Sequence, residues 1–482
     1  MFDVRPVFNV IGLLVAFLGV TMLFPFAIDL VRGNGHWGVF LESSAITMLA
    51  GGLTYLATRD DDIRGLSLQQ TFMLTTGVWV ALPIFGALPF CLGATEATYT
   101  DAFFEAMSGL TTTGATVFTG LEHLPDGLLL WRAILQWLGG IGIIVVAMVF
   151  LPELGVGGMQ IFKSEGFDTF GKILPRATEI ASQIAWLYLA LTGTCAVVYL
   201  ATGMGTFDAV VHAMTTIATG GFSSYDASFS RFGASAEYAG TIFMILAALP
   251  FVRYVQLING QPWSIFKDSQ IRAFICILFV AVAAVTMFLW QTSLLPGELG
   301  FRKAMFNVVS IVTGTGYASA NYSSWGAVTI VLFFYAGLIG GCAGSTSCSV
   351  KVFRYQLLAA AIVTQIAKIS TPNGVFPLRY QGRAVGEGVV NSVITFFVVF
   401  FATLGLAALA LLFVGLDPIT AISGAAAALA NIGPGLGAEI GPNGNYAGLN
   451  DAAKWILAIT MLIGRLELLA VFALFTLRFW RI

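Results

Sequence analysis

Stretches of apolar residues long enough to cross a lipid bilayer are the strongest constraint that this sequence places on its fold. Phe8 to Val31, Ile271 to Trp290 and Trp455 to Phe479 are three of about ten such stretches, each close to the roughly 20 residues that span a membrane as a helix. With 57% hydrophobic and only 10% charged residues, the chain cannot bury its apolar surface in a water-soluble core. The sequence therefore predicts an all-α polytopic membrane protein.

Four short glycine-containing segments divide the chain into similar parts. Their glycines, which we call the repeat glycines, follow one another at intervals of about 100 residues, and this indicates an internal repeat. An alanine stands twelve positions before each repeat glycine, and a serine or threonine stands six positions before the first three. The fourth segment departs from this pattern, because Ala427 stands six positions before its glycine. The repeat glycines are Gly114, Gly221, Gly316 and Gly433, and the matching alanines are Ala102, Ala209, Ala304 and Ala421.

Each repeat alanine and its glycine enclose about a dozen good helix formers, too few to span a bilayer. Long apolar stretches flank them, so each unit is predicted to be a span, a half-length pore helix, a glycine loop and a second span. Unwound backbone occurs at membrane depth only where protein buries it or water reaches it, so four such loops predict a shared central pore. Asp101 and Asp208 are predicted to cap the first two half-length helices. The predicted divisions are two extra transmembrane helices over 1–66, then pore units over 67–165, 166–263, 264–380 and 381–482.

Basic residues indicate which ends of the spans face the cytoplasm. If the spans alternate from a cytoplasmic N-terminus, sixteen of the 23 Lys and Arg residues fall inside, six fall outside, and Arg465 lies in mid-membrane. Positive residues are enriched on the cytoplasmic side of membrane proteins. We therefore expect both termini in the cytoplasm and all four glycine loops on the external half.

The loops contain the residues that a cation-selective ring requires. Backbone carbonyls can replace the hydration shell of an ion, and glycine can adopt the conformations that aim successive carbonyls at one axis. Each half-length helix adds the negative end of its dipole, and threonine hydroxyls can add an oxygen or brace the loop. The fourth loop has Asn431 and Ile432 where the other loops have threonine or glycine, so we expect only approximate fourfold symmetry. The predicted ion-binding residues are Thr112, Thr113, Gly114, Thr219, Gly220, Gly221, Gly314, Thr315, Gly316, Asn431, Ile432 and Gly433.

A glycine-rich segment, Gly337 to Ser349, interrupts the second span of the third unit. Four glycines among small polar residues should not sustain a continuous helix in lipid. One interpretation is a close-packing site for small residues. The other is a flexible gating loop beneath the ring. The candidate gating residues in this segment are Gly340, Gly341, Gly344, Ser345 and Thr346.

Arg465 lies near the middle of the last apolar stretch, where an uncompensated charge is costly and indicates a function. We expect it to face the pore below the ring and to act as an electrostatic barrier that the gate must move or screen. The alternative is a structural interaction with Glu467 or with loop carbonyls. Glu105 and His212, both on half-length helices, are interpreted as mainly structural.

These motifs resemble those of the potassium transporters that carry four hairpin repeats in one chain, in particular the bacterial Trk branch with its TrkH and TrkG proteins. The resemblance covers nearly the whole chain, and only the Ser345 to Ser349 stretch departs from the more glycine-rich pattern of the family. It implies that potassium is the transported ion, bound at the filter loops, and that the protein works in the bacterial inner membrane. It also implies a homodimer, and a cytosolic TrkA-like ring subunit that binds nucleotide and controls the gate. No cofactor is expected on this chain. The motifs are 110–116, 309–318, 340–346, 431–437 and 463–467.

Two other classes of function compete with a pore. A sodium- or proton-coupled secondary transporter would rock two inverted halves. Here each unit contains two full spans and keeps the same orientation, and no acidic residue is clearly placed in mid-membrane near the loops. An enzyme lacks support, because His36, His123 and His212 do not cluster with carboxylates at the spacing of metal ligands. A net charge of −2 gives no indication of nucleic acid as a partner.

Overall fold

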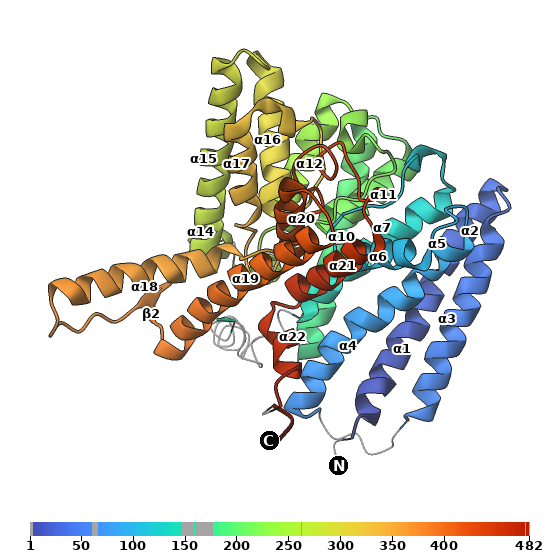
Figure 1. The fold of residues 1–482 in the computed structure, drawn as a ribbon, viewed down its shortest axis with the longest axis horizontal. Helices are drawn as coiled ribbons and strands as arrows, with labels where there is room; N and C mark the ends of the chain where they lie inside the picture. The colour runs from blue at the N-terminus through green and yellow to red at the C-terminus, as the bar shows by residue number, and fades with distance from the viewer. Residues whose placement is uncertain are drawn as a thin grey trace.

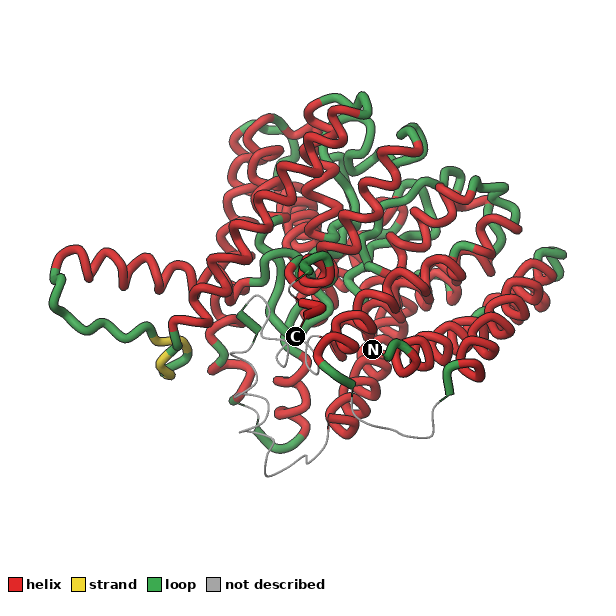
Figure 2. Tube along the Cα trace, turned by 60° about the horizontal axis from the view of Figure 1, so that its bottom comes forward, coloured by secondary structure: helices red, strands yellow, loops and turns green. Residues whose placement is uncertain are grey.

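The computed structural model describes residues 3–59, 66–146, 158–159, 177–261, 263–477 and 479–481. They form a bundle of helices with one antiparallel pair of very short strands, β1 (Arg379–Tyr380) and β2 (Arg383–Ala384) (Figure 2). Figure 1 shows the N-terminal helices on one side of the bundle and α18 projecting from the other. The predicted all-α architecture is confirmed. The predicted boundary between residues 165 and 166 lies outside the described residues.

Three helices precede the first repeat unit, and two of them pack tightly against each other. They are α1 (Arg5–Thr21), α2 (Leu23–Arg32) and α3 (Trp37–Ala57). α1 and α3 lie side by side (Figure 1), and a methyl group built at Gly51 of α3 would lie only 2.3 Å from Ala16 N of α1. Small residues allow helix backbones in a membrane to approach this closely.

The other helices follow in four groups, and each group contains a short helix that leads into one glycine loop. The first group is α4 (Leu68–Gly86), α5 (Leu88–Leu92), α6 (Tyr99–Leu110) and α7 (Asp126–Val145). The second is α10 (Ala177–Ala201), α11 (Thr206–Ile217), α12 (Ala234–Ala247) and α13 (Phe251–Ile258). The third is α14 (Ser264–Lys267), α15 (Ser269–Gln291), α16 (Gly297–Thr313), α17 (Ala327–Gly337) and α18 (Val352–Ser370). The fourth is α19 (Glu387–Phe413), α20 (Pro418–Ala430), α21 (Asp451–Arg465) and α22 (Leu469–Leu474). Single 3-10 turns are η1 (Leu121–His123), η3 (Ser228–Arg231), η4 (Tyr322–Trp325) and η5 (Phe479–Arg481).

Eight helices in the described part of the chain are long and apolar enough to cross a membrane, or nine if α12 and α13 form one bent span. The sequence predicts about ten spans, and some of the later ones are broken in the described part of the chain. α12 and α13 meet at 88°, and a non-helical segment separates α17 from α18. The predicted span from Trp455 to Phe479 is not one helix, since α21 ends at Arg465 and α22 begins at Leu469.

The short helices that precede the loops contain 12 residues in α6 and α11, 17 in α16 and 13 in α20. The prediction that Asp101 and Asp208 cap the first two of them is wrong. Thr98 caps α6 by accepting a hydrogen bond from Asp101 N at 3.2 Å, and Gly205 stands at the cap of α11. Both helices therefore start earlier than predicted, and the two carboxylates lie in the first turn, where the helix dipole favours negative charge.

α20 has a carboxylate at its N-terminus. Asp417 accepts hydrogen bonds from Ile419 N at 2.9 Å and Thr420 N at 3.0 Å. Hydrogen bonds with Thr420 hold the pKa of the Asp417 carboxyl below its usual range. The cap therefore stays charged and satisfies two N–H groups that have no partner within the helix.

Candidate functional site

All four short helices end in loops with the same backbone conformation. The residue two positions before each repeat glycine has positive φ, with values of 53°, 49°, 77° and 53° at Thr112, Thr219, Gly314 and Asn431. The repeat glycines have φ between 77° and 98°. In every loop the N–H two positions before the glycine donates to the carbonyl three residues earlier, at 3.0 to 3.3 Å. The fourth loop keeps this geometry despite its different sequence, because asparagine tolerates the left-handed conformation.

The four loops form a closed ring in which each repeat glycine lies against the next loop. A methyl group built on each glycine would collide with one carbonyl oxygen, always that of the residue just before the next repeat glycine. The pairs are Gly114 with Gly220, Gly221 with Thr315, Gly316 with Ile432, and Gly433 with Thr113, at 2.2, 1.9, 1.9 and 2.7 Å. The loops therefore follow one another in chain order and the fourth returns to the first. Only glycine combines this approach with positive φ.

The threonine hydroxyls one position before the repeat glycines brace their own loops. Thr113 Oγ1 lies 2.7 Å from Thr111 Oγ1, and Thr315 Oγ1 lies 2.8 Å from Thr313 Oγ1. Both partners stand at or directly after the end of the preceding helix. Of the two roles predicted for threonine, bracing is the one these contacts serve.

Two other oxygens of the ring are buried without a hydrogen-bond partner in the described structure, Thr112 Oγ1 and Asn431 Oδ1. They occupy equivalent positions in the first and fourth loops, which are neighbours in the ring. The amide nitrogen of Asn431 is satisfied, since it donates to Thr113 Oγ1 at 2.9 Å and to Met461 O at 3.0 Å. Buried polar atoms are normally paired, so these two oxygens stay available for a further contact.

Side chains outside the predicted site also hold the loops, and the sequence interpretation missed them. Gln136 of α7 donates from Nε2 to Gly220 O at 2.6 Å and accepts from Phe222 N at 3.1 Å. Tyr446 donates from its hydroxyl to Gly433 O at 2.7 Å. A fully buried glutamine within an apolar helix is the signal that would have found the first of these contacts.

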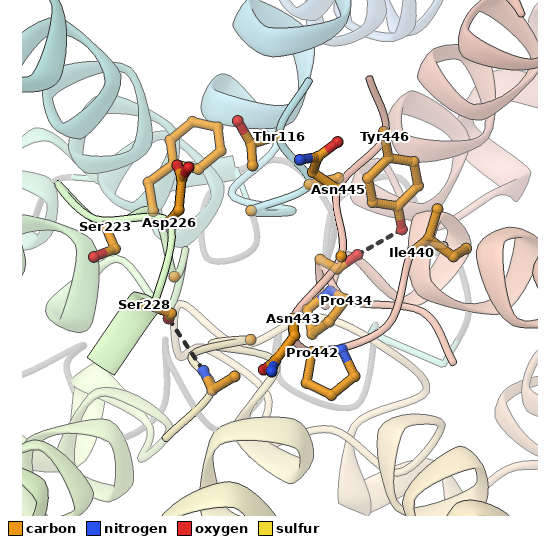
Figure 3. Close-up of a pocket in the computed structure, with 18 of the residues that line it drawn as sticks. Thr116, Ser223, Asp226, Ser228, Pro434, Ile440, Pro442, Asn443, Asn445 and Tyr446 are labelled. Atoms are coloured by element: carbon orange, nitrogen blue, oxygen red, sulfur yellow. Dashed lines mark hydrogen bonds between the residues drawn. The ribbon is translucent and has the colours of Figure 1, made fainter. Parts of the chain in front are cut away.

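A cavity of about 170 Å³ opens on one side of the ring, and all four repeat glycines line it. Figure 3 shows Ser223 and Asp226 on one wall and Pro442 and Asn443 on the opposite wall. The Asp226 carboxylate accepts hydrogen bonds from Gly120 N at 2.7 Å and Leu121 N at 3.1 Å, so it joins the outer arms of the first two loops. The cavity therefore lies directly against the ring on this side.

A buried ion pair lies behind the first loop. Glu105 Oε1 accepts from Arg132 Nε at 2.8 Å, and Glu105 Oε2 accepts from Val117 N at 2.9 Å. Arg132 also donates to Ser223 O of the second loop at 2.7 Å. An acidic residue therefore lies beside the first loop, and its charge is compensated by Arg132.

His212 of α11 packs behind the second loop. Its Nδ1 lies 2.9 Å from Asp208 O, and its Nε2 lies 3.0 Å from Ser223 Oγ. Both ring nitrogens are thus used within the protein. These contacts, like those of Glu105, are the ones that a structural residue makes.

The segment between α17 and α18 lies against the third loop, and most of its residues are buried. Ser347 Oγ donates to Thr313 O at 2.7 Å and accepts from Gly341 N at 2.8 Å. Thr346 Oγ1 donates to Ala247 O of α12 at 3.0 Å. The segment is therefore fixed both to the third loop and to the second unit, on the Gly314 side of the ring rather than on the cavity side.

Arg465 connects this segment to the first unit. Its guanidinium donates from Nη2 to Gly139 O of α7 at 2.9 Å and from Nη1 to Thr346 O at 3.4 Å, and it contacts the Cys348 thiol. The side chain is 1% exposed. Of the two structural alternatives considered from the sequence, the interaction with a loop carbonyl is present.

Glu467 pairs with cations of the third unit instead of with Arg465. Its carboxylate accepts from Lys351 Nζ at 2.5 Å and forms a second ion pair with Arg354. Glu467 and Leu468 have positive φ, 58° and 54°. This conformation interrupts the helix between α21 and α22. The interrupted segment and the break after α21 are therefore held together by buried charges.

Within the described residues, no group of three or more His, Cys, Asp or Glu side chains could hold a metal ion. An ion in the ring would be held by backbone, hydroxyl and amide oxygens without full charges. This is the type of coordination that allows an ion to enter and also to leave.

Comparison with known proteins gives consistent matches over the whole chain. The TrkH family model, described as "Cation transport protein", matches residues 36–480. The chain is 42% identical to the Trk system potassium uptake protein TrkI of Halomonas elongata, over 99% of this chain and 97% of that protein. It is 35% identical to the Trk system potassium uptake protein TrkH of Escherichia coli, over 99% of both. The crystal structure of the potassium transporter TrkH from Vibrio parahaemolyticus superposes with a TM-score of 0.92 over 100% of both chains, at 34% identity.

Proposed function

The chain belongs to the TrkH family of cation transport proteins, and from this premise we propose that it takes up potassium through a channel-like pore whose selectivity filter is the ring of four loops. It is a multi-pass membrane protein of a transporter family, not an enzyme. One observation carries the proposal: each repeat glycine lies against a carbonyl of the next loop, so four distant parts of the chain form one closed ring.

Potassium is proposed to enter from the cavity and to exchange its water for oxygens of the ring. The ring carbonyls of residues 113, 220, 315 and 432 supply one layer of oxygens. The unpaired oxygens of Thr112 and Asn431 belong to the next layer, on the side away from the cavity. A ring of neutral oxygens stabilises a monovalent cation through dipoles and does not trap it.

The segment between α17 and α18 is proposed to be the gate. In the present conformation Ser347 binds the carbonyl that precedes Gly314, so the segment is fastened to the filter itself. Movement of the segment then requires the loss of the hydrogen bonds that tie it to its surroundings. They are made by Cys342, Ala343, Gly344, Thr346 and Ser347.

Arg465 is proposed to keep the closed gate in place and to oppose cations there. Its positive charge lies against the segment at Thr346 and Cys348 and is anchored to α7 through Gly139. Among the residues that the structure describes, no carboxylate pairs with Arg465. A buried guanidinium of this kind repels a cation strongly, because the surrounding dielectric constant is low. Movement of the segment would move or screen this charge.

The surroundings of α18 support a homodimer. α18 projects from the bundle (Figure 1) and presents Ile362, Val363, Ile366 and Ile369, each at least half exposed. A cavity of about 620 Å³ lies between α18 and α19. We propose that a second copy covers this surface, that the protein works in the bacterial inner membrane with both termini in the cytoplasm, and that a cytosolic nucleotide-binding ring subunit controls the gate.

Coupling to protons or sodium is the competing mechanism. A proton-coupled transporter needs a titratable carboxylate on the ion path. Beside the loops, Glu105 is engaged by Arg132 and by Val117 N, and Asp226, which lines the cavity, accepts hydrogen bonds from Gly120 N and Leu121 N. This arrangement favours uncoupled movement down the electrochemical gradient.

Ion flux through purified protein in liposomes tests the proposal. We expect rubidium and potassium to move downhill without a sodium or proton gradient, and sodium to move much more slowly. Gly316→Ser should abolish this preference. Gly193→Ser is the matched control, since a methyl group at Gly193 of α10 meets nothing within 4 Å. Strict dependence on a second ion, or intact selectivity in Gly316→Ser, would contradict the proposed pore.

A further inference from the structure

A second cavity, lined by none of the ring residues, lies where α13, α14 and the β1–β2 hairpin meet the start of α15. Its volume is about 270 Å³. Three basic side chains line it, with one carboxylate and several amides. They are Arg253, Lys267 and Arg383, together with Asp268, Gln256, Gln261, Gln381 and Ser264.

The carboxylate in this cavity is already neutralised. Asp268 is buried, caps α15 by accepting from Gln270 N at 2.8 Å, and pairs with Arg253 Nε at 2.6 Å. Lys267 and Arg383 are exposed, and neither pairs with a carboxylate among the residues that the structure describes. The cavity therefore has an excess of about two positive charges. In addition, the Ser264 hydroxyl is buried without a hydrogen-bond partner in the described part of the chain.

The apolar residues around the cavity are those of a membrane interface. α13 turns by 88° from α12, so it lies nearly perpendicular to a helix of the bundle. Three apolar side chains on this stretch are largely exposed: Ile258 (71%), Trp263 (67%) and Phe266 (69%). Exposed aromatic residues next to basic ones are typical of the headgroup region, where an aromatic ring can sit in the interface while a cation meets phosphate.

From this combination we propose that the cavity binds the phosphate headgroup of an anionic phospholipid. Lys267 and Arg383 pair with the phosphate, and the acyl chains lie along the apolar surface of Ile258, Trp263 and Phe266. Basic pockets between membrane helices on the cytoplasmic side recognise anionic headgroups in this way. The site is separate from the ring, so its existence does not depend on the proposed ion pathway.

Lipid binding to the purified full-length protein tests the site. Native mass spectrometry during titration with phosphatidylglycerol, and separately with phosphatidylcholine, gives the apparent affinity for the first bound lipid. Lys267→Gln combined with Arg383→Gln should weaken phosphatidylglycerol binding by about thirtyfold and leave phosphatidylcholine binding unchanged, since each basic residue near an anionic headgroup contributes about 1 kcal/mol. Lys267→Arg combined with Arg383→Lys, which keeps the charges, should retain the affinity.

Arg379→Gln is the matched control, because Arg379 is an exposed arginine of the same hairpin that does not line the cavity. An equal loss in this control would show diffuse attraction and overturn the site. Displacement of the lipid by millimolar inorganic phosphate would assign the cavity to a soluble anion, and this too would overturn the proposal. If the double variant keeps its lipid affinity but loses binding of a cytosolic protein partner, the cavity is a protein-binding surface instead.

Discussion

Replacing Gly316 with alanine should disturb the ring far more than replacing Gly314 with asparagine, although the two positions are two residues apart in one loop. Both glycines have positive φ, 82° at Gly316 and 77° at Gly314. They differ in their surroundings. A methyl group at Gly316 would lie 1.9 Å from Ile432 O, whereas the nearest atom to one at Gly314 is 3.7 Å away.

The size of the effect follows from this difference. Ordinary contact begins at 3.4 Å, so the carbonyl of Ile432 must retreat by about 1.5 Å to accept alanine at Gly316. That movement removes one oxygen from the ring. The lost interaction joins one carbonyl oxygen and the ion, and we take its strength from that of a hydrogen bond to a charged group, about 1.5–3 kcal/mol. Potassium affinity should therefore fall by about ten- to a hundredfold. The left-handed conformation adds a cost of about 1–2 kcal/mol for an alanine, which should lower the stability of the loop.

Asparagine at Gly314 serves as the internal control. The corresponding residue of the fourth loop is Asn431, with φ of 53°, and this residue type tolerates the left-handed region better than most. Gly314→Asn should therefore change potassium affinity by less than about threefold, since its Cβ has room next to Asn431 O and asparagine has a small backbone cost in this conformation.

Rubidium uptake into liposomes, inhibited by increasing potassium or sodium, measures the affinity and the selectivity of each variant. Size-exclusion chromatography confirms that both variants fold. The reasoning is refuted if Gly316→Ala keeps the potassium affinity of the parent protein, or if Gly314→Asn loses as much affinity as Gly316→Ala.

Three further substitutions test the contacts around the ring. Ser347→Ala removes a hydroxyl that makes two hydrogen bonds, at about 0.5–1.5 kcal/mol each, so rubidium flux should rise by about tenfold; unchanged flux would argue against a gate at this segment. Glu467→Gln removes the carboxylate charge that pairs with Lys351 and Arg354 and should lower the free energy of unfolding by about 3–5 kcal/mol, measured by thermal unfolding in detergent; Glu467→Asp should lose less, and equal losses would contradict the charge argument. Asp417→Ala removes the cap of α20 and should cost about 1 kcal/mol in the same assay, whereas Asp417→Ser should restore most of it; no difference between the two would exclude a capping role.

The sequence was sufficient to predict the membrane class and the position of the ring. Each repeat glycine has positive φ, which is a local preference of glycine, whereas the lack of space for a side chain comes from contact with the next loop. The interrupted helix after Gly337 was predicted for the same reason, because glycine and small polar residues disfavour a helix by themselves. The assignments of individual residues to ion binding and gating stay predictions.

Other features gave little or no local signal. Thr98, and not Asp101, caps α6. The two capping residues are three positions apart, and the packing of the helix in the bundle decides which of them stands at its start. The break between Arg465 and Leu469 contains neither glycine nor proline. It is stabilised by ion pairs between Glu467 and residues of the third unit more than 110 positions earlier in the chain.

The sequence alone thus determined that this chain lies in a membrane and carries four short segments with a glycine at equivalent positions, because apolar content and local backbone preference are properties of short stretches. The tertiary structure decided that the four loops close into one ring in chain order, that Gln136 and Tyr446 hold two of its carbonyls, and that Arg465 lies against the interrupted segment instead of against Glu467. These are contacts between residues separated by tens to hundreds of positions. Their geometry depends on how whole helices pack, and no local pattern encodes it.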